Sequence, residues 1–233
     1  MKKLGIIGAM TQEVETLLGH MENQTVATWA GSTFYEGKLS GLDVVVVQCG
    51  IGKVNAALCA QILCDRYAVT HIVNTGIAGS LSAELDIGDL VVSKDAMYHD
   101  FDCCAFGYPA GKVPGMDVVA FPADEMMTAL AFAAAERENP GHTRMGRVAS
   151  GDQFVADPEL KNKIISLTGA LCTEMEGAAI AQTAYRNGVP FVILRAISDK
   201  ADDSAEMDYP TFERLAAYRC ASVTMSLAGA LAK

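Results

Sequence analysis

Short apolar runs alternate with longer amphipathic stretches along the whole chain. Five of the short runs are nearly continuous in Val, Ile and Leu, which is typical of strands whose two faces are both covered. The expected strands are Leu4–Ala9, Val44–Cys49, His71–Thr75, Leu90–Ser93 and Phe191–Ile197. Trp29–Leu39 alternates more strongly and ends in Ser40-Gly41, so it is expected to be a hairpin arm leading into the strand at Val44.

Patterns with helical spacing follow most of these runs. Helices are expected at Thr11–Met21, Val54–Asp65, Asp124–Glu138, Asp157–Ser166, Gly177–Asn187 and Thr211–Leu231. The Gly- and Pro-rich stretch Phe101–Pro122 is expected to form a long loop. Because no linker or repeat interrupts the alternation, the pattern predicts one α/β domain over residues 1–233 with a mixed, largely parallel sheet.

Composition narrows the class of protein. The chain has 233 residues, of which 51% are hydrophobic and 20% charged, enough apolar material for a sizeable core. Its net charge of -10 argues against nucleic acid or an anionic membrane as a partner. The apolar stretch after Lys3 is too short for a secretory signal or a membrane span, and seven cysteines without a C-x-x-C pattern indicate free thiols. A cytoplasmic location is therefore expected.

Two glycine-containing turns have incomplete cofactor motifs. Gly50-Ile51-Gly52-Lys53 lacks the spacer and the Ser or Thr of a phosphate-binding loop, and Gly5–Gly8 is too short for a dinucleotide fingerprint. Both are expected to be strand-to-helix turns. His99 and Asp100 form a polar cluster without convergent ligands, and it is interpreted as loop and interface. Neither a cofactor nor a metal is expected.

The segment Asn74–Ser80 follows a buried strand and contains two glycines. Glycines there would let a ligand approach the backbone closely, because no side chain stands in the way. A purely structural turn explains the same spacing equally well.

Three acidic residues share one local setting, the end of a strand or the start of the following helix. They are Glu13, Glu176 and Asp199, and the carboxyl ends of strands are where ligands bind in open α/β sheets. Each could alternatively be an ordinary helix-cap or turn residue. Together with Arg195 they resemble an acid–base site, since glycosidic cleavage needs one protonated and one ionised carboxyl group. The pattern alone does not assign the two roles.

Nine segments, in this order along nearly the whole chain, resemble one known family. They read GIIGAM-x-x-E, CGIGKVNAA, NTGIAG, GDLVVS, YHDFD, AFGY, SGDQF, TEMEGAAIA and RAISDKAD. The sequence is similar to the bacterial 5′-methylthioadenosine/S-adenosylhomocysteine nucleosidases of the nucleoside phosphorylase superfamily. The resemblance implies a three-layer α/β/α sandwich, a homodimer, and hydrolysis of an N-glycosidic bond to adenine and a 5-substituted ribose without a cofactor. The substrates it implies are methylthioadenosine, S-adenosylhomocysteine and also 5′-deoxyadenosine.

The resemblance also implies roles for individual residues. Asp199 would be the general acid at adenine N7, Glu13 would activate the attacking water, and Glu176 would bind the ribose hydroxyls. Further contacts with the nucleoside or with these acids are expected from Ala78, Gly79, Phe154, Val155, Met175, Arg195 and Ser198. Phe154 would stack on adenine while the backbone of Val155 reads the edge of the base.

The 5′ substituent and the dimer partner involve a second set of residues. Met10, Ile51 and Tyr209 would line the thioalkyl pocket. The loop 106–114 would complete the partner's pocket through Phe106, Tyr108 and Pro114. One position departs from the family pattern, because Ile77 stands where Ser is common. The contact that this Ser makes on the sugar and water side of the pocket is therefore not available from the side chain of residue 77.

Three other functions stay open at this level. A purine nucleoside phosphorylase has the same fold, but Glu13 and the apolar Ile77 are poor neighbours for a phosphate dianion. A nucleosidase for aminodeoxyfutalosine and a non-catalytic nucleoside-binding protein are the other two. Glu174, two residues before Glu176, is expected to support the site by pairing with a basic group or with nearby backbone.

Overall fold

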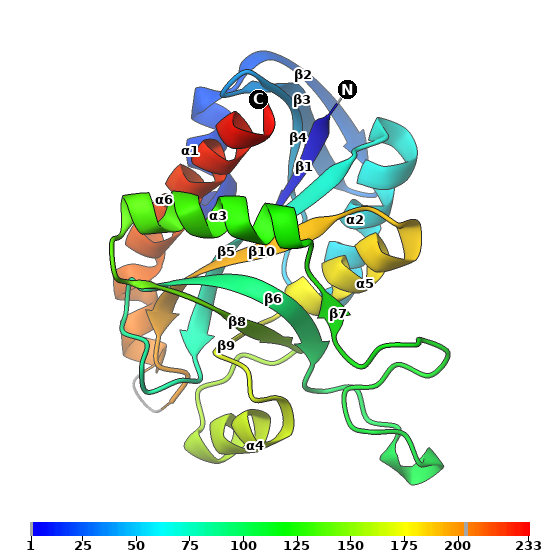
Figure 1. Cartoon of the computed structure of the whole chain (residues 1–233), viewed down its shortest axis with the longest axis vertical. Helices are drawn as coiled ribbons and strands as arrows, with labels where there is room; N and C mark the ends of the chain where they lie inside the picture. The colour runs from blue at the N-terminus through cyan, green and yellow to red at the C-terminus, as the bar shows by residue number, and fades with distance from the viewer. Residues whose placement is uncertain (1, 203–204) are drawn as a thin grey trace.

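The architecture is a mixed sheet between two layers of helices (Figure 1). The structure, a computed structural model, describes residues 2–202 and 205–233. Within these residues ten strands form one sheet: β1 (Lys3–Gly8), β2 (Glu22–Trp29), β3 (Ser32–Leu39), β4 (Leu42–Gln48), β5 (His71–Ser80), β6 (Leu90–Tyr98), β7 (Phe121–Pro122), β8 (Thr143–Ser150), β9 (Cys172–Glu174) and β10 (Phe191–Asp199). The helices are α1 (Thr11–His20), α2 (Lys53–Tyr67), the 3-10 turn η1 (Cys104–Phe106), α3 (Glu125–Glu138), α4 (Pro158–Thr168), α5 (Gly177–Asn187) and α6 (Ala205–Leu231).

The strand order is β10-β6-β8-β9-β5-β1-β4-β3-β2, with β7 beside β6. Because β10 also pairs with β5, the strands β5, β10, β6, β8 and β9 close into a ring at one end of the sheet. Parallel pairs join β4, β1, β5 and β10, whereas half of all the described pairings are antiparallel. The sheet is mixed, as predicted, with a smaller parallel share than the continuous apolar runs indicated.

Two cores explain why the strands are apolar on both faces. In β4, Val44 and Val46 pack on the side of α1, α3 and α6, while Val45 and Val47 pack on the side of α2 and α5. Side chains alternate across a strand, so an uninterrupted run of valines supplies both cores. The predicted three-layer arrangement is confirmed.

Local capping sets several helix boundaries. The side chain of Asp157 accepts the backbone N–H groups of Glu159 and Leu160 at the start of α4, and Gly169 ends this helix in the left-handed conformation. Gly188 ends α5 in the same way. These residues set both ends of α4 and the end of α5, and both helices begin and end within two residues of where the sequence predicts.

Several elements differ from the prediction. The segment Asn74–Ser80 is the second half of β5 and not a turn, and β10 likewise continues to Asp199. The expected single arm Trp29–Leu39 is the end of β2 and all of β3, joined by Ala30 and Gly31, both at positive φ as in a tight hairpin turn.

The other misplaced elements have identifiable causes. Strand β8 was not predicted because Arg144, Gly146 and Arg147 interrupt its apolar pattern; Arg147 pairs with Asp95 of β6 at 2.6 Å. Helix α6 begins at Ala205, six residues before the predicted start, and Pro210 lies in its interior.

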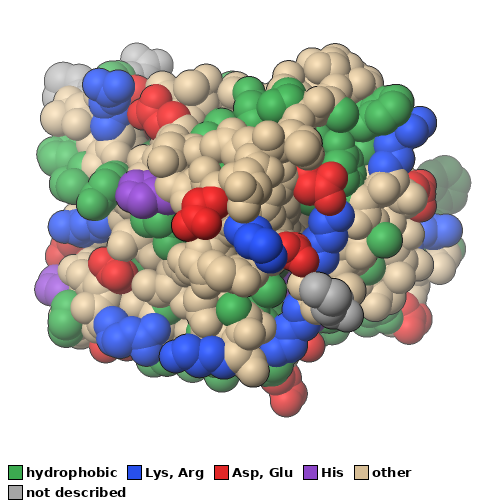
Figure 2. Space-filling view, turned by 90° about the horizontal axis from the view of Figure 1, so that it is seen from above, with side chains coloured by type: hydrophobic (Ala, Val, Ile, Leu, Met, Phe, Trp, Pro, Cys, Tyr) green, Lys and Arg blue, Asp and Glu red, His purple; other side chains and the backbone are tan. Residues whose placement is uncertain are grey.

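One face of the molecule has, in the part of the chain that the structure describes, no patch of a single charge sign (Figure 2). Basic and acidic side chains are interspersed on the face seen in Figure 2. Among the described residues, no helix combines the length and the apolar character that crossing a membrane requires.

Candidate active site

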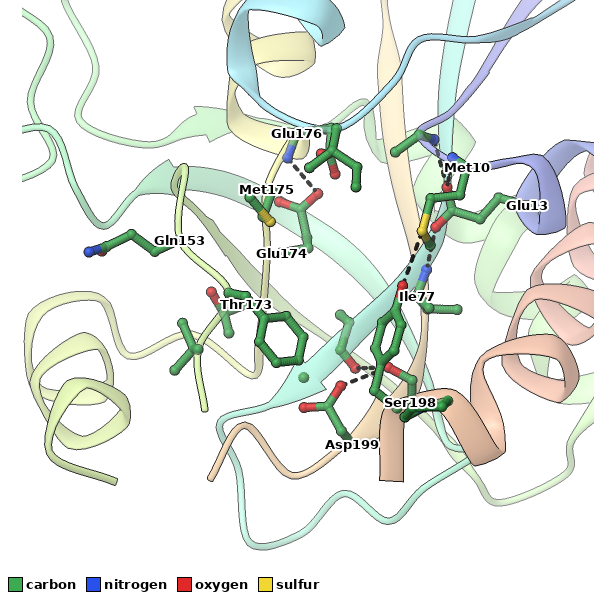
Figure 3. A pocket seen from close by; sticks show the side chains of 18 residues that line it. Met10, Glu13, Ile77, Gln153, Thr173, Glu174, Met175, Glu176, Ser198 and Asp199 are labelled. Carbon is green, nitrogen blue, oxygen red and sulfur yellow. Dashed lines mark hydrogen bonds between the residues drawn. The ribbon is translucent and has the colours of Figure 1, made fainter. Parts of the chain in front are cut away.

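A cavity of about 510 Å³ lies at the carboxyl ends of β1, β5, β9 and β10 (Figure 3). Its volume is in the range of small-ligand sites, and its walls are mostly apolar. The predicted site residues that line it are Met10, Glu13, Ile51, Ala78, Gly79, Phe154, Val155, Met175, Glu176, Ser198, Asp199 and Tyr209. The fold therefore brings together three carboxyl groups that are far apart in sequence.

Glu13 projects from the first turn of α1 and is buried. Its Oε2 accepts the N–H groups of Ala9 (2.6 Å) and Met10 (3.0 Å), and its Oε1 accepts the N–H of Ile77 (3.1 Å). Burial raises the pKa of Glu13, while the charge of Arg195 and these three N–H groups oppose the rise. The result is an oriented carboxyl group with a greater proton affinity than a free glutamate.

Asp199 ends β10 on the opposite side of the cavity (Figure 3). Its Oδ2 accepts the hydroxyl of Ser198 and its Oδ1 accepts the N–H of Ala201, each at 2.8 Å. Burial raises its pKa against these two hydrogen bonds, and the nearby acids Asp208 and Asp202 raise it further. An acid with a raised pKa beside an apolar cavity is suited to donating a proton.

Glu176 is the residue that precedes α5, and its side chain reaches the turn before α2. Its Oε1 accepts the N–H of Gly52 at 2.7 Å. Burial and, next, the charge of Glu174 raise the pKa of Glu176 to about 8. Gly52 has φ +98°, so a glycine turn with no cofactor motif serves to present a backbone donor to this acid.

Glu174, which also lines the cavity, forms a buried ion pair with Arg195. Arg195 is 2% exposed and is not part of the cavity wall; its Nη2 donates to Glu174 and to Asn74. Glu174 also accepts the N–H groups of Glu176 and Gly177. The expectation that Glu174 pairs with a basic group or with backbone is confirmed, since it does both.

The mouth of the cavity is aromatic. The rings of Phe154 and Tyr209 meet edge to face with centroids 5.6 Å apart, and the Tyr209 hydroxyl contacts Met10 Sδ at 3.0 Å. Phe154 is half exposed. These side chains enclose an apolar region between α1, α6 and the segment before α4.

The predicted loop residues lie elsewhere. Phe106, Tyr108 and Pro114 are outside the cavity, on the long loop between β6 and β7 that projects from the body of the molecule (Figure 1). Phe106 is 82% exposed. Within one chain this loop does not close the cavity.

Ile77 and Glu174 also line the cavity, and sequence reasoning missed four further lining residues, namely Ala9, Gln153, Thr173 and Pro210. Each adjoins a predicted residue in the chain, which is the signal that was available. Thr173 faces Gly79 in the antiparallel register of β9 with β5, a pairing that no local pattern reveals.

Comparison with known proteins gives consistent results. The model of the phosphorylase superfamily matches residues 3–228. A 5′-methylthioadenosine/S-adenosylhomocysteine nucleosidase of Halalkalibacterium halodurans is 40% identical over 232 residues, covering 99% of this chain and 100% of the relative.

Solved structures agree with that sequence match. A nucleosidase of the same name from Neisseria meningitidis, in complex with methylthio-immucillin-A, has a TM-score of 0.96, 36% identity and coverage of 99% and 100% of the two chains. The futalosine hydrolase of Helicobacter pylori has a TM-score of 0.92 and 33% identity, with 97% of each chain covered.

Proposed function

Because the chain belongs to the phosphorylase superfamily, and within it to the family of 5′-methylthioadenosine/S-adenosylhomocysteine nucleosidases, we propose that its cavity hydrolyses the N-glycosidic bond of these two nucleosides. The products are adenine and the 5-substituted ribose, and 5′-deoxyadenosine is a further substrate. The observation that carries the proposal is the convergence of buried Glu13, Glu176 and Asp199, with raised pKa values, on one apolar cavity.

The reaction breaks the bond between C1′ and N9 and forms a bond between C1′ and a water oxygen. Asp199 donates a proton to adenine N7, which makes the base a better leaving group. Glu13 orients the water and takes its proton as the new bond forms. Positive charge develops on the sugar ring in the oxocarbenium-like transition state, and nearby carboxylates stabilise it.

Glu176 binds the ribose hydroxyls in this proposal. Its Oε1 accepts the N–H of Gly52, and Glu176 lines the cavity, so in this proposal Oε2 is the oxygen that accepts from the ribose. Met175 packs against the sugar, Phe154 stacks on adenine and the Val155 backbone reads its edge. Met10, Ile51 and Tyr209 form the apolar site for the 5′ substituent.

A homodimer is part of the proposal. The loop with Phe106, Tyr108 and Pro114 completes the partner's cavity, which accounts for large apolar side chains on a projecting segment.

The likeness to a futalosine hydrolase favours a second candidate, hydrolysis of aminodeoxyfutalosine by the same residues. Comparing kcat/KM for the nucleosides ranks the candidates. Phosphorolysis is disfavoured because Glu13 and the apolar side chain of Ile77 occupy the side from which the acceptor attacks.

The test is release of adenine from methylthioadenosine in phosphate-free buffer. We expect the wild type to turn over without phosphate, and the Asp199→Asn variant to lose about 10²- to 10⁴-fold in kcat while substrate affinity changes little. Product formation that depends on phosphate would reject hydrolysis. A variant with nearly wild-type kcat would reject Asp199 as the acid.

A further inference from the structure

Glu174 makes more contacts in this region than any of the acids given a direct role. Its Oε2 accepts from Arg195 Nη2, from the N–H of Glu176 (3.1 Å) and from the N–H of Gly177 (2.8 Å). Its Oε1 accepts from the Ser150 hydroxyl and again from the N–H of Gly177, at 3.0 Å. In every one of these contacts Glu174 is the acceptor, so its oxygens are occupied by protein donors.

One set of contacts leads to the sugar side of the cavity. Glu176 and Gly177 form the start of α5, where backbone N–H groups have no partner within the helix and favour a negative charge. Gly177 permits this approach, since a Cβ there would lie 2.9 Å from Glu174 Oε1. Glu174 thereby holds the backbone of Glu176 in place.

The other contact leads to the water side. Arg195 Nη2 is shared between Glu174 and Asn74, and Arg195 Nη1 lies next to Gly76. A Cβ on Gly76 would clash with Glu13 Oε1 and lie 2.9 Å from Arg195 Nη1, so the guanidinium and Glu13 meet across this glycine. Anchoring Arg195 therefore sets the electrostatic environment of Glu13.

We propose that Glu174 is a positioning residue that holds Glu176 and Arg195, and through Arg195 the environment of Glu13, in their working arrangement. This inference rests on the proposed hydrolysis, in which Glu13 and Glu176 act on water and sugar. Glu174 borders the cavity, but both of its oxygens already accept from protein donors, so it acts on the reaction through Glu176 and Arg195.

Glutamine is a sharp probe of this role. It has nearly the same shape as glutamate, but its amide nitrogen is a donor and cannot accept a hydrogen bond. Whichever way the amide turns, the negative charge beside Arg195 is lost. With the nitrogen in place of Oε2, an NH₂ group also faces Arg195 and the N–H groups of Glu176 and Gly177; with the nitrogen in place of Oε1, it faces the Ser150 hydroxyl and the N–H of Gly177. The Glu174→Gln variant therefore weakens the hold on Arg195 in either orientation.

The experiment measures kcat, KM and the pH profile of adenine release for wild type, Glu174→Gln and a control. Glu15→Gln removes the same charge from an exposed position on α1 and is the matched control. We expect Glu174→Gln to lower kcat by about 10- to 100-fold, since misplacement of catalytic groups by an ångström has effects of this size. The control keeps wild-type values.

The pH profile separates positioning from mere stabilisation of the fold. Burial raises the pKa of Glu176 most, the charge of Glu174 raises it next and Glu13 adds to the rise, while the Gly52 N–H and Arg195 lower it. In Glu174→Gln the part of the pH profile of adenine release that follows the ionisation of Glu176 should therefore move to lower pH. Wild-type kcat, or a fall in thermal stability with kcat and pH profile unchanged, overturns the inference.

A second variant guards against a failure to fold. Ser150→Ala removes one donor to Glu174 and the acceptor for the Ala178 N–H, at 2.7 Å, while keeping all charges. We expect a roughly fivefold lower kcat, the effect of one lost hydrogen bond, and an unchanged kcat counts against the proposal. A wild type that releases no adenine refutes the proposed function and this role with it, whereas an active wild type with equally active variants refutes only the role.

Discussion

At the scale of residues, two glutamates only two positions apart make different contacts. Glu174 turns toward the start of α5 and Arg195, whereas Glu176 turns toward Gly52 and the cavity. The strand β9 ends at Glu174, so the alternation of an extended chain does not continue through Glu176. The change of backbone at this point gives the two carboxyl groups different hydrogen-bond partners, although both residues line the cavity.

Two glycines of β5 lie within the strand, where they allow carboxyl groups to approach the backbone; they do not form a turn. Gly76 lies between Glu13 and Arg195, and a Cβ on Gly79 would lie 2.8 Å from Asp199 Oδ1. Both glycines sit inside a strand, where their usual cost is lost packing. Their value here is that they let acids from α1 and β10 approach the strand.

The raised pKa of Glu176 predicts how stability depends on pH. Its folded pKa is about 8 and its ordinary value is 4.5, so between these values the folded protein holds a proton that the unfolded chain releases. The stabilisation is complete below pH 4.5 and is lost as the pH rises through 8. Glu13 and Asp199 shift in the same direction.

Urea unfolding at intervals from pH 5 to pH 8 tests this expectation. The free energy of unfolding should fall with rising pH, with a contribution from Glu176 of at most about 1.4 kcal/mol per pH unit. Glu176→Gln should flatten the curve, and the exposed Glu15→Gln should not. A wild-type stability that increases over this range would contradict the assignment.

At the scale of elements, the site depends on where strands end. β1, β5 and β10 are parallel neighbours, so the residues after β1 and at the ends of β5 and β10 reach the same edge. β9 enters antiparallel to β5 and brings Thr173 and Glu174 to that edge as well. The pairing of β10 with β5 closes the ring, and both strands contribute residues to the wall of the cavity.

The end of α2 provides a test of element stability away from the site. Ala68 follows this helix with φ 49° and ψ 44°, a left-handed conformation that glycine adopts without strain, and the N–H of Val69 bonds to the carbonyl of Leu63 at 3.2 Å. Ala68→Gly should raise the free energy of unfolding by about 0.5–1 kcal/mol.

The matched control is Ala57→Gly in the interior of the same helix, which should lower the free energy of unfolding by about 1 kcal/mol. Chemical denaturation of the two variants measures both changes. If Ala68→Gly were destabilising too, strain at position 68 would not be the explanation.

At the scale of the whole molecule, the projecting loop between β6 and β7 is the feature that one chain leaves unexplained. Phe106 is 82% exposed at its tip, and the side chains of Val54 and Leu58 on α2 are also exposed. Such apolar exposure is typical of surfaces that meet a partner. The proposed homodimer gives the loop a function in the neighbouring cavity.

Complementation between two impaired variants tests this arrangement. Phe106→Ala lacks the loop contact and Asp199→Asn lacks the acid, so each homodimer should have low activity. In a mixed dimer, one cavity combines an intact Asp199 with an intact loop from the partner. Co-expression should recover about a quarter of wild-type kcat, the share of complete sites under random pairing. No recovery would mean that each loop serves its own chain or none.

The sequence by itself determined the features that depend on neighbouring residues. Apolar runs indicated β1, β4 and the core of β10, and capping residues such as Asp157 and Gly188 set helix ends. The position of Glu13, Glu176 and Asp199 at strand ends and helix starts was also visible, because it depends only on the order of elements.

Only the tertiary structure decided which groups meet. The pairing of Glu174 with Arg195, the approach of Glu13 and Asp199 to glycines of β5, and the contact of Glu176 with Gly52 join residues 21 to 124 positions apart. Strand β8 and the closure of the ring likewise depend on pairing between distant segments. Such contacts form because burial and hydrogen bonding stabilise the whole packed arrangement together, and no local pattern of residues encodes them.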